Sequence, residues 1–170
     1  SYCCLFKVKM NETIKRKLDL LPNKPGSYQM KDKNGTIIYV GKAKSLVKRV
    51  KQYFTRPQVG KVMLMVQEIT DLDWIETHSE KEAFLLEINL IQKYYPKYNI
   101  LLKDGRMYPY IGVKRTEQPV LKIFHKQTSK AYDYFGPYPD SNAAHKVMEL
   151  LNRTYPVSRE EFTPGKPSFY

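Results

Sequence analysis

Cysteine and histidine are scarce in this sequence. The only two cysteines, Cys3 and Cys4, are adjacent, and neighbouring residues make poor disulfide partners. The three histidines, His78, His125 and His145, do not have the spacing of a metal site. We therefore expect no disulfide scaffold, no zinc site and no catalysis based on histidine.

Long apolar runs are also lacking, because no stretch approaches the roughly 18 residues that suggest a membrane-spanning helix. The first ten residues are apolar only briefly and have no convincing signal-peptide cleavage site. Hydrophobic residues make up 42% of the chain, which is enough for a folded core. We expect a cytoplasmic protein with one substantial domain, or a small domain with an added subdomain, and no membrane partner.

Acidic residues are few, with 17 against 29 basic ones, and the net charge of +12 suits a polyanion such as nucleic acid. Between Lys42 and Gln67 there are seven basic residues and no carboxylate, with Tyr53 and Phe54 interleaved. We interpret this stretch as a surface that faces phosphate groups. The residues in and beside it that we expect to contact DNA are Gly41, Lys44, Lys48 and Lys51.

Two β-prone runs, 27–31 and 36–40, flank the pair Asn34-Gly35, which is typical of a tight hairpin turn. If the loop has an even number of residues, Tyr28 and Tyr39 share one face of the sheet, with Gly41 close to Tyr28. Two phenols on one face form either a functional site or an aromatic cross-strand pair that stabilises the sheet. The hairpin alone leaves both interpretations open.

Apolar spacing and capping residues predict the remaining elements. We predict an α+β fold with a small antiparallel sheet, flanked by helices and followed by a C-terminal β/α extension. The sheet consists of the hairpin Ser27–Val40 and a third strand near Asp71–Thr77. The predicted helices are 9–21, 44–54, 61–69 and 80–95. The predicted extension has strands at 108–114 and 120–125, a turn at 135–139 and a helix from 140 or 141 to 154.

Glu87 is a carboxylate inside the apolar arc of the predicted helix 80–95. Such a group needs an ion pair, hydrogen bonds or a metal ion to offset the cost of burial. An ion pair with Arg49 or a lysine and the ligation of a metal are equally compatible with the pattern. Since no second acid stands beside Glu87, one divalent ion completed by water and phosphate fits better than a two-metal site.

Gly26-Ser27-Tyr28 and Tyr39-Val40-Gly41 resemble the paired signature of the GIY-YIG nuclease family. Further residues at the spacing of that family are Arg49, Tyr53, Glu87 and Asn99. The similarity is greater still to its UvrC branch, which acts in bacterial excision repair, and it covers residues 11–156. The resemblance implies a nuclease domain at 10–103 and a β/α extension at 104–156. Residues 1–9 are then an atypical leader, and we expect 157–170 to be a poorly ordered tail.

The resemblance implies an endonuclease that makes the 3′-side incision in nucleotide excision repair. Its substrate would be damaged double-stranded DNA, and UvrB would be the partner of the full-length protein. Tyr39 would act as the general base or orient the attacking water, and Glu87 would hold one Mg²⁺ or Mn²⁺ ion. Lys42 and Arg49 would stabilise the phosphate. The residues that complete the implied site are Tyr28, Tyr53 and Asn99.

Two other functions stay open from the sequence. The basic stretch also fits a DNA-binding or scaffold fragment that does not cut, because the later regions of full-length family members do not occur in these 170 residues. A stand-alone nuclease of the same family, acting on branched or flapped DNA, is the other alternative. As a fragment, the chain is expected to be a monomer.

Overall fold

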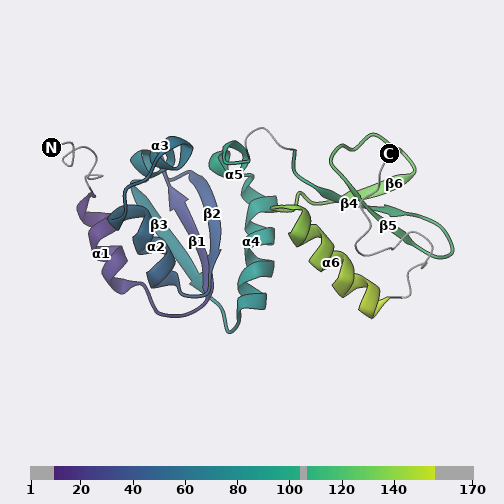
Figure 1. The fold of residues 1–170 in the computed structure, drawn as a ribbon, viewed down its shortest axis with the longest axis horizontal. Coiled ribbons are helices and arrows are strands. Elements are labelled where there is room, and N and C mark those ends of the chain that lie inside the picture. Colours follow the sequence, from purple (N-terminus) through teal and green to yellow (C-terminus); the bar gives the residue numbers. More distant parts are fainter. Residues whose placement is uncertain (1–9, 104–106, 156–170) are drawn as a thin grey trace. The chain divides into compact units, whose positions relative to one another are not determined.

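The computed structural model describes residues 10–103 and 107–155, and the chain divides into two compact units between these ranges (Figure 1). Each unit contains a three-stranded antiparallel sheet, with five helices in the described part of the first unit and one in that of the second, so the predicted α+β fold is confirmed. The predicted leader, 1–9, and tail, 157–170, lie outside the described residues. No helix in the described ranges is both long and apolar enough to cross a membrane.

The first unit contains five helices and three strands within residues 10–103. In chain order they are α1 (Glu12–Leu20), β1 (Gly26–Lys31), β2 (Ile37–Ala43), α2 (Leu46–Thr55), α3 (Gly60–Glu68), β3 (Asp71–Glu76), α4 (Glu80–Tyr94) and α5 (Lys97–Leu101). The strand order is β2-β1-β3, so β1 is central and β2 forms one edge. Helix α5 was missed from the sequence, because five residues are too few to show a helical period.

The helices begin where the sequence offers capping side chains. Asn11 accepts a hydrogen bond from the backbone of Ile14 at the start of α1, over 2.8 Å. At the start of α4, Ser79 accepts one from the backbone of Glu82, over 3.1 Å. The carboxylate of Glu82 reaches back to the backbone of His78, one residue before the position expected for a capping box.

The loop between β1 and β2 has five residues, 32–36, so the even-numbered loop assumed from Asn34-Gly35 is wrong. The backbone N–H of Asp32 donates to the carbonyl of Thr36, and the carbonyl of Asp32 accepts from Gly35. Gly35 has φ +76°, in the left-handed region that glycine tolerates best. The carboxylate of Asp32 also accepts hydrogen bonds from the backbones of Asn34 and Thr36, which favours this wider turn.

A β-bulge in β2 restores the register that was expected for the hairpin. Lys31 faces Ile37 across this five-residue loop, and the pairing then shifts between Lys31 and Met30. Ile38 is the extra residue of the bulge. The partners beyond the bulge are Met30 with Tyr39 and Tyr28 with Gly41. The two tyrosines therefore lie on one face of the sheet in spite of the wrong loop length.

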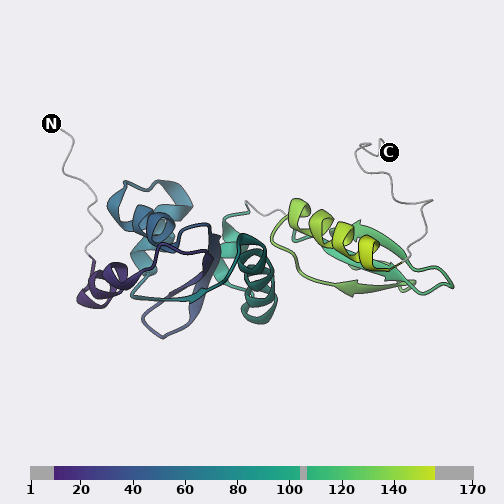
Figure 2. The same ribbon diagram turned by 90° about the horizontal axis from the view of Figure 1, so that it is seen from below.

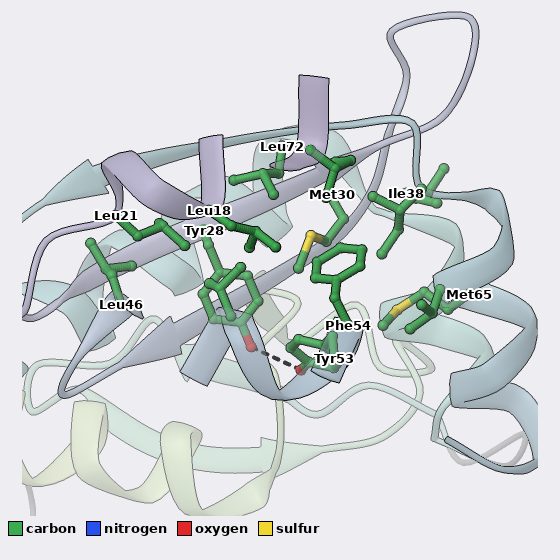
Figure 3. Packing of buried hydrophobic residues seen from close by; sticks show 14 of the residues in the cluster. Leu18, Leu21, Tyr28, Met30, Ile38, Leu46, Tyr53, Phe54, Met65 and Leu72 are labelled. Carbon is green, nitrogen blue, oxygen red and sulfur yellow. Dashed lines mark hydrogen bonds between the residues drawn. The ribbon is translucent and has the colours of Figure 1, made fainter. Parts of the chain in front are cut away.

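The two faces of the first sheet are covered by different helices (Figure 1). Helices α1, α2 and α3 contribute to a core on one face, whose largest members include Tyr28, Met30, Leu46 and Leu72 (Figure 3). Helix α4 packs against β1 and β2 on the other face, where Ser27 is fully buried. The edge strand β2 therefore has the core with α1, α2 and α3 on one side and α4 on the other. The side chains of the predicted site surround this strand.

The second unit, from residue 107, has its own sheet in the order β5-β4-β6. Its elements are β4 (Tyr110–Lys114), β5 (Val120–Phe124), β6 (Tyr132–Phe135) and α6 (Ser141–Thr154). The two predicted strands and the last helix are confirmed, with Asp140 as the cap of α6. Strand β6 was missed, because it has four residues and Phe135 was assigned to the turn that follows.

A cluster of polar side chains around Glu68 ties two helices of the first unit together. The Glu68 carboxylate on α3 accepts hydrogen bonds from the Tyr98 hydroxyl at 2.6 Å and from Lys97 at 3.0 Å, both on α5. The hydrogen bond from Tyr98 and then that from Lys97 hold the pKa of Glu68 below its usual value. Burial, followed by Glu68, raises the pKa of Tyr98 to about 12. These contacts anchor the short helix α5 beside α3.

We expect the free energy of unfolding to fall as the pH drops below about 4, in part because of Glu68. A carboxylate with a lowered pKa in the folded state stabilises the fold above its unfolded pKa and loses this effect as it is protonated. The Glu68 side chain is 41% exposed, so the contribution is small. Urea unfolding of Glu68→Gln at pH 7 and at about pH 3 should show a weaker pH dependence than the wild type. Glu12→Gln, at a side chain 91% exposed, should leave the dependence unchanged.

Candidate active site

Three tyrosines from three elements form a cluster on the inner face of the first sheet. Tyr28 lies on β1, Tyr39 on β2 and Tyr53 on α2, with ring centroids 6.0 to 6.3 Å apart. The hydroxyls of Tyr28 and Tyr53 are hydrogen bonded over 2.9 Å (Figure 3). Tyr28 is 1% exposed and Tyr53 is 7% exposed, whereas Tyr39 is only partly buried. The prediction that Tyr28 and Tyr39 share a face is confirmed.

Gly41 lies directly beneath the ring of Tyr28. A Cβ at Gly41 would overlap the hydroxyl and the ring of Tyr28, its partner across the strands. The glycine of the second triplet is therefore required by the position of Tyr28. Its backbone is buried, so the structure gives it a packing role in addition to the DNA contact that was expected of it.

We expect Gly41→Ala to displace Tyr28 and to destabilise the fold by about 1–3 kcal/mol, the usual cost of overpacking. The new methyl group has no room while the Tyr28 ring stays in place. Urea unfolding of Gly41→Ala, Tyr28→Ala and the double variant measures the coupling between the two sites. A double variant whose loss equals the sum of the single losses would contradict this explanation.

Arg49 stands beside the tyrosine cluster on α2. Its guanidinium carbon lies 5.3 Å from the ring centroid of Tyr53, four residues further along the helix, as predicted from their spacing. Lys48 is exposed on the same helix, Lys51 is partly buried, and Lys44, before the helix, lies 3.6 Å from Glu80. The basic stretch therefore places one guanidinium next to the cluster and several ammonium groups at the surface.

Glu87 is 8% exposed on α4, so its predicted burial is confirmed. The apolar arc of this helix is buried at Phe84, Ile88 and Ile91, but Tyr94 and Tyr95 at its end are exposed. The ammonium of Lys42, on β2, lies 3.4 Å from Glu87 Oε1. Lys42 also lies 5.4 Å from the centroid of the Phe84 ring, one turn earlier on α4. Since Lys42 pairs with Ser27 in the sheet, Lys42 points to the face that α4 covers, away from Tyr28. The ion pair anticipated for Glu87 is thus with Lys42 and not with Arg49.

Asn99 binds the outer edge of β2. Its side-chain amide donates to the carbonyl of Val40 and its amide oxygen accepts from the N–H of Val40, each over 2.9 Å. The side chain therefore pairs with β2 as a neighbouring strand would. Val40 stands between Tyr39 and Gly41, so Asn99 positions the second triplet by holding its backbone. Tyr98 and Glu68 were missed from the sequence as supports of this helix, since a contact between distant residues leaves no local signal.

We expect Asn99→Ala to lower the free energy of unfolding by about 1–3 kcal/mol, because it leaves two backbone groups of Val40 without this partner. Asn99→Asp should be no better, since its carboxylate would face the carbonyl of Val40. Hydrogen exchange of the Val40 amide should be faster in both variants. Asn89→Ala, at an exposed position on α4, is a matched control that should leave this amide unchanged.

Comparison with known proteins places these features in a family. The family described as the UvrC-like GIY-YIG domain matches residues 24–100. The UvrABC system protein C of two Streptococcus agalactiae strains, of serotypes III and V, is 52% identical over 161 residues. This chain belongs to the UvrC-like GIY-YIG family. The match covers 95% of the chain but only 27% of those relatives, so the chain spans about a quarter of their length.

Solved structures of the GIY-YIG domain are available for the UvrC of Thermotoga maritima. One, described as bound to its catalytic divalent cation, magnesium, is 47% identical to this chain. It covers 52% of the chain and 98% of that domain, with a TM-score of 0.48. A point mutant of the same domain, described as bound to the catalytic divalent cation, is 46% identical, with the same score.

Burial raises the pKa of Tyr39 in this GIY-YIG domain well above its ordinary value. Tyr53 and Glu87 act in the same direction, and Arg49 opposes them. Burial likewise raises the pKa of Tyr28. The phenol of Tyr39 is therefore protonated at neutral pH in the protein alone. The influence of Glu87 also shows that this carboxylate lies within electrostatic reach of Tyr39, although it comes from the other side of β2.

The donor set of the GIY-YIG domain suits a single hard cation at Glu87. Carboxylate oxygen is a preferred ligand of Mg²⁺, which keeps several waters when one or two carboxylates bind it. The 3.4 Å contact with Lys42 is longer than a strong charge-assisted hydrogen bond, so a bound cation can replace it. In the described ranges no group of three or more His, Cys, Asp or Glu residues is arranged to hold a metal.

Proposed function

We propose that this chain is a metal-dependent DNA endonuclease module whose site surrounds the edge strand β2. The observation that carries the proposal is the convergence of three groups on this strand. Tyr39 and the other tyrosines lie on one face, Glu87 and Lys42 on the other, and Asn99 holds the strand edge. The similar GIY-YIG domain of the UvrC of Thermotoga maritima is described as an endonuclease domain, which supports the same activity.

Glu87 would hold one divalent cation, Mg²⁺ or Mn²⁺, which supplies a Lewis acid next to the scissile phosphate. The Thermotoga maritima domain, 47% identical in sequence, binds magnesium as its catalytic cation. The planar fork of Arg49 binds two phosphate oxygens, and Lys42 adds a second positive charge. These cations offset the charge that develops on the phosphate during hydrolysis.

Tyr39 orients the attacking water in this proposal. A protonated phenol accepts a hydrogen bond from water through its oxygen and donates its own proton to a phosphate oxygen. The hydrogen bond between Tyr28 and Tyr53 fixes the rings that pack against Tyr39. The raised pKa of Tyr39 argues against a phenolate base in the protein alone, so of the two roles anticipated we favour the orientation of water.

We further propose that the module makes the 3′-side incision in nucleotide excision repair, on damaged double-stranded DNA and together with UvrB. The supporting observation is the 52% identity to UvrABC system protein C. The exposed cations of the basic stretch, including Lys48, would contact the DNA backbone beside the site.

Nicking of supercoiled plasmid with Mg²⁺ or Mn²⁺, and with EDTA as the control, tests the activity. An end-labelled duplex with one bulky lesion, preloaded with UvrB, tests the position of the cut. A single nick on the 3′ side of the lesion supports the repair function. Equal cutting of undamaged flapped DNA would identify a structure-specific nuclease, and metal-independent binding without nicking would refute the proposed activity.

A further inference from the structure

The sheet of the second unit has one face rich in aromatic rings, which we call the aromatic face. Cross-strand partners point to the same side of a sheet, and the register therefore defines this face. Its members are Tyr110, Gly112, Lys114, Val120, Lys122, Phe124, Tyr132 and Tyr134.

Three rings on this face meet above the central strand. The ring of Phe124, on β5, lies 4.8 Å from that of Tyr132 and 5.2 Å from that of Tyr134, both on β6. They lie over Gly112 of β4, where a Cβ would overlap the Phe124 ring. The glycine lets rings from the two outer strands come together as one patch across the sheet.

Helix α6 covers the opposite face. It packs against β4 and β5 and buries Ala144 and Met148, while Ile111, which points away from the aromatic face, is 1% exposed. Figure 2 shows α6 along one side of this sheet and, within residues 107–155, no helix across the other. The rings of Phe124, Tyr132 and Tyr134 accordingly remain partly exposed. This face is therefore available to a partner as far as residues 107–155 are concerned.

The charge on the aromatic face has one sign. Lys114 and Lys122 are exposed there, and the ammonium of Lys122 lies 5.8 Å from the centroid of the Phe124 ring. No carboxylate is a member of the face. Asp133 points to the other side of β6 and pairs with Arg115. Aromatic rings with lysines beside them complement a ligand in which flat aromatic groups are connected by anionic linkages.

We propose that the aromatic face of the second unit binds single-stranded nucleic acid. Exposed rings on a sheet provide stacking surfaces for unstacked bases, and the lysines contact the backbone phosphates. In a duplex the faces of the bases are already stacked on one another, so the rings cannot reach them. The inference goes beyond the proposed nuclease function, because binding here needs neither the metal nor any residue of the GIY-YIG site.

Fluorescence anisotropy of a labelled oligothymidylate of about 10 nucleotides, with the full chain in EDTA, measures this binding. Phe124→Leu and Tyr132→Leu retain apolar side chains but remove the stacking surface. Each should weaken binding at least about fivefold, the lower limit for the loss of one stacked base. Phe135→Leu is the matched control, because Phe135 is 54% exposed but belongs to the opposite face. Unchanged melting temperatures would show that the variants are folded.

Lysine variants test the contact with phosphates. Lys114→Gln and Lys122→Gln should each lower the slope of log affinity against log salt by about 0.7, as expected for one phosphate contact with a single strand. Lys126→Gln, beyond the end of β5, should not change the slope. Wild-type affinity in both leucine variants would overturn the proposal. A dimer of the chain that forms in the wild type but not in these variants would overturn it as well. Metal-dependent nicking of plasmid, followed in parallel, reports on the GIY-YIG site separately.

Discussion

Glu87→Gln is expected to lower metal-dependent nicking by about 10²- to 10³-fold or more, the usual loss when a key electrostatic group is removed from an active site. The glutamine keeps the size of the side chain but not its negative charge. Because Glu87 is the buried acid of the site, the cation would lose its protein ligand. Plasmid nicking across a Mg²⁺ titration measures the loss of activity, and Mn²⁺ paramagnetic resonance measures the loss of metal binding.

Glu80→Gln is the matched control for this change, since Glu80 lies on the same helix with a side chain that is 61% exposed. Its loss breaks only a surface contact with Lys44, which contributes little to stability. Activity and metal binding should both stay at the wild-type level. Equal metal dependence in Glu87→Gln and the wild type would show that the ion is held elsewhere.

The part of this site that the sequence predicted depends on local spacing. Arg49 and Tyr53 are four residues apart on a helix, and the buried arc of α4 repeats with the helical period, so both could be placed without a structure. The facing tyrosines of the hairpin were also predicted, although for an incomplete reason. A bulge at Ile38 compensates for a loop of odd length, and bulges leave little trace in the sequence.

The rest depends on contacts between distant residues. Lys42 and Glu87 are 45 positions apart, and Asn99 is 59 positions from Val40. No periodic pattern links such residues, so the sequence left the partner of Glu87 undecided between Arg49 and a lysine. The family resemblance assigned Asn99 to the site, but only the structure shows how it binds the edge of β2.

Tyr39→Phe is expected to lower the nicking rate by about 10²- to 10³-fold, the usual loss when one hydrogen-bonding group that acts on the transition state is removed. The change removes only the hydroxyl, and the ring retains its contacts with Tyr28 and Tyr53, so the fold should be preserved. DNA affinity in Ca²⁺ should stay within about threefold, since Arg49 and the basic surface provide the binding. Tyr155→Phe, at a residue 63% exposed at the end of α6, is the matched control and should be fully active.

The pH dependence of this loss separates the two roles of the hydroxyl. Burial, Tyr53 and Glu87 raise the pKa of Tyr39, so the phenol stays protonated across the neutral range. If the protonated phenol orients the water, the ratio of wild-type to Tyr39→Phe rates stays constant from about pH 7 to 9. If a phenolate acts as the base, the ratio rises about tenfold per pH unit, because the ionised fraction of Tyr39 grows by that factor. We expect the constant ratio, because burial, Tyr53 and Glu87 together outweigh Arg49 and oppose a negative charge on the oxygen of Tyr39.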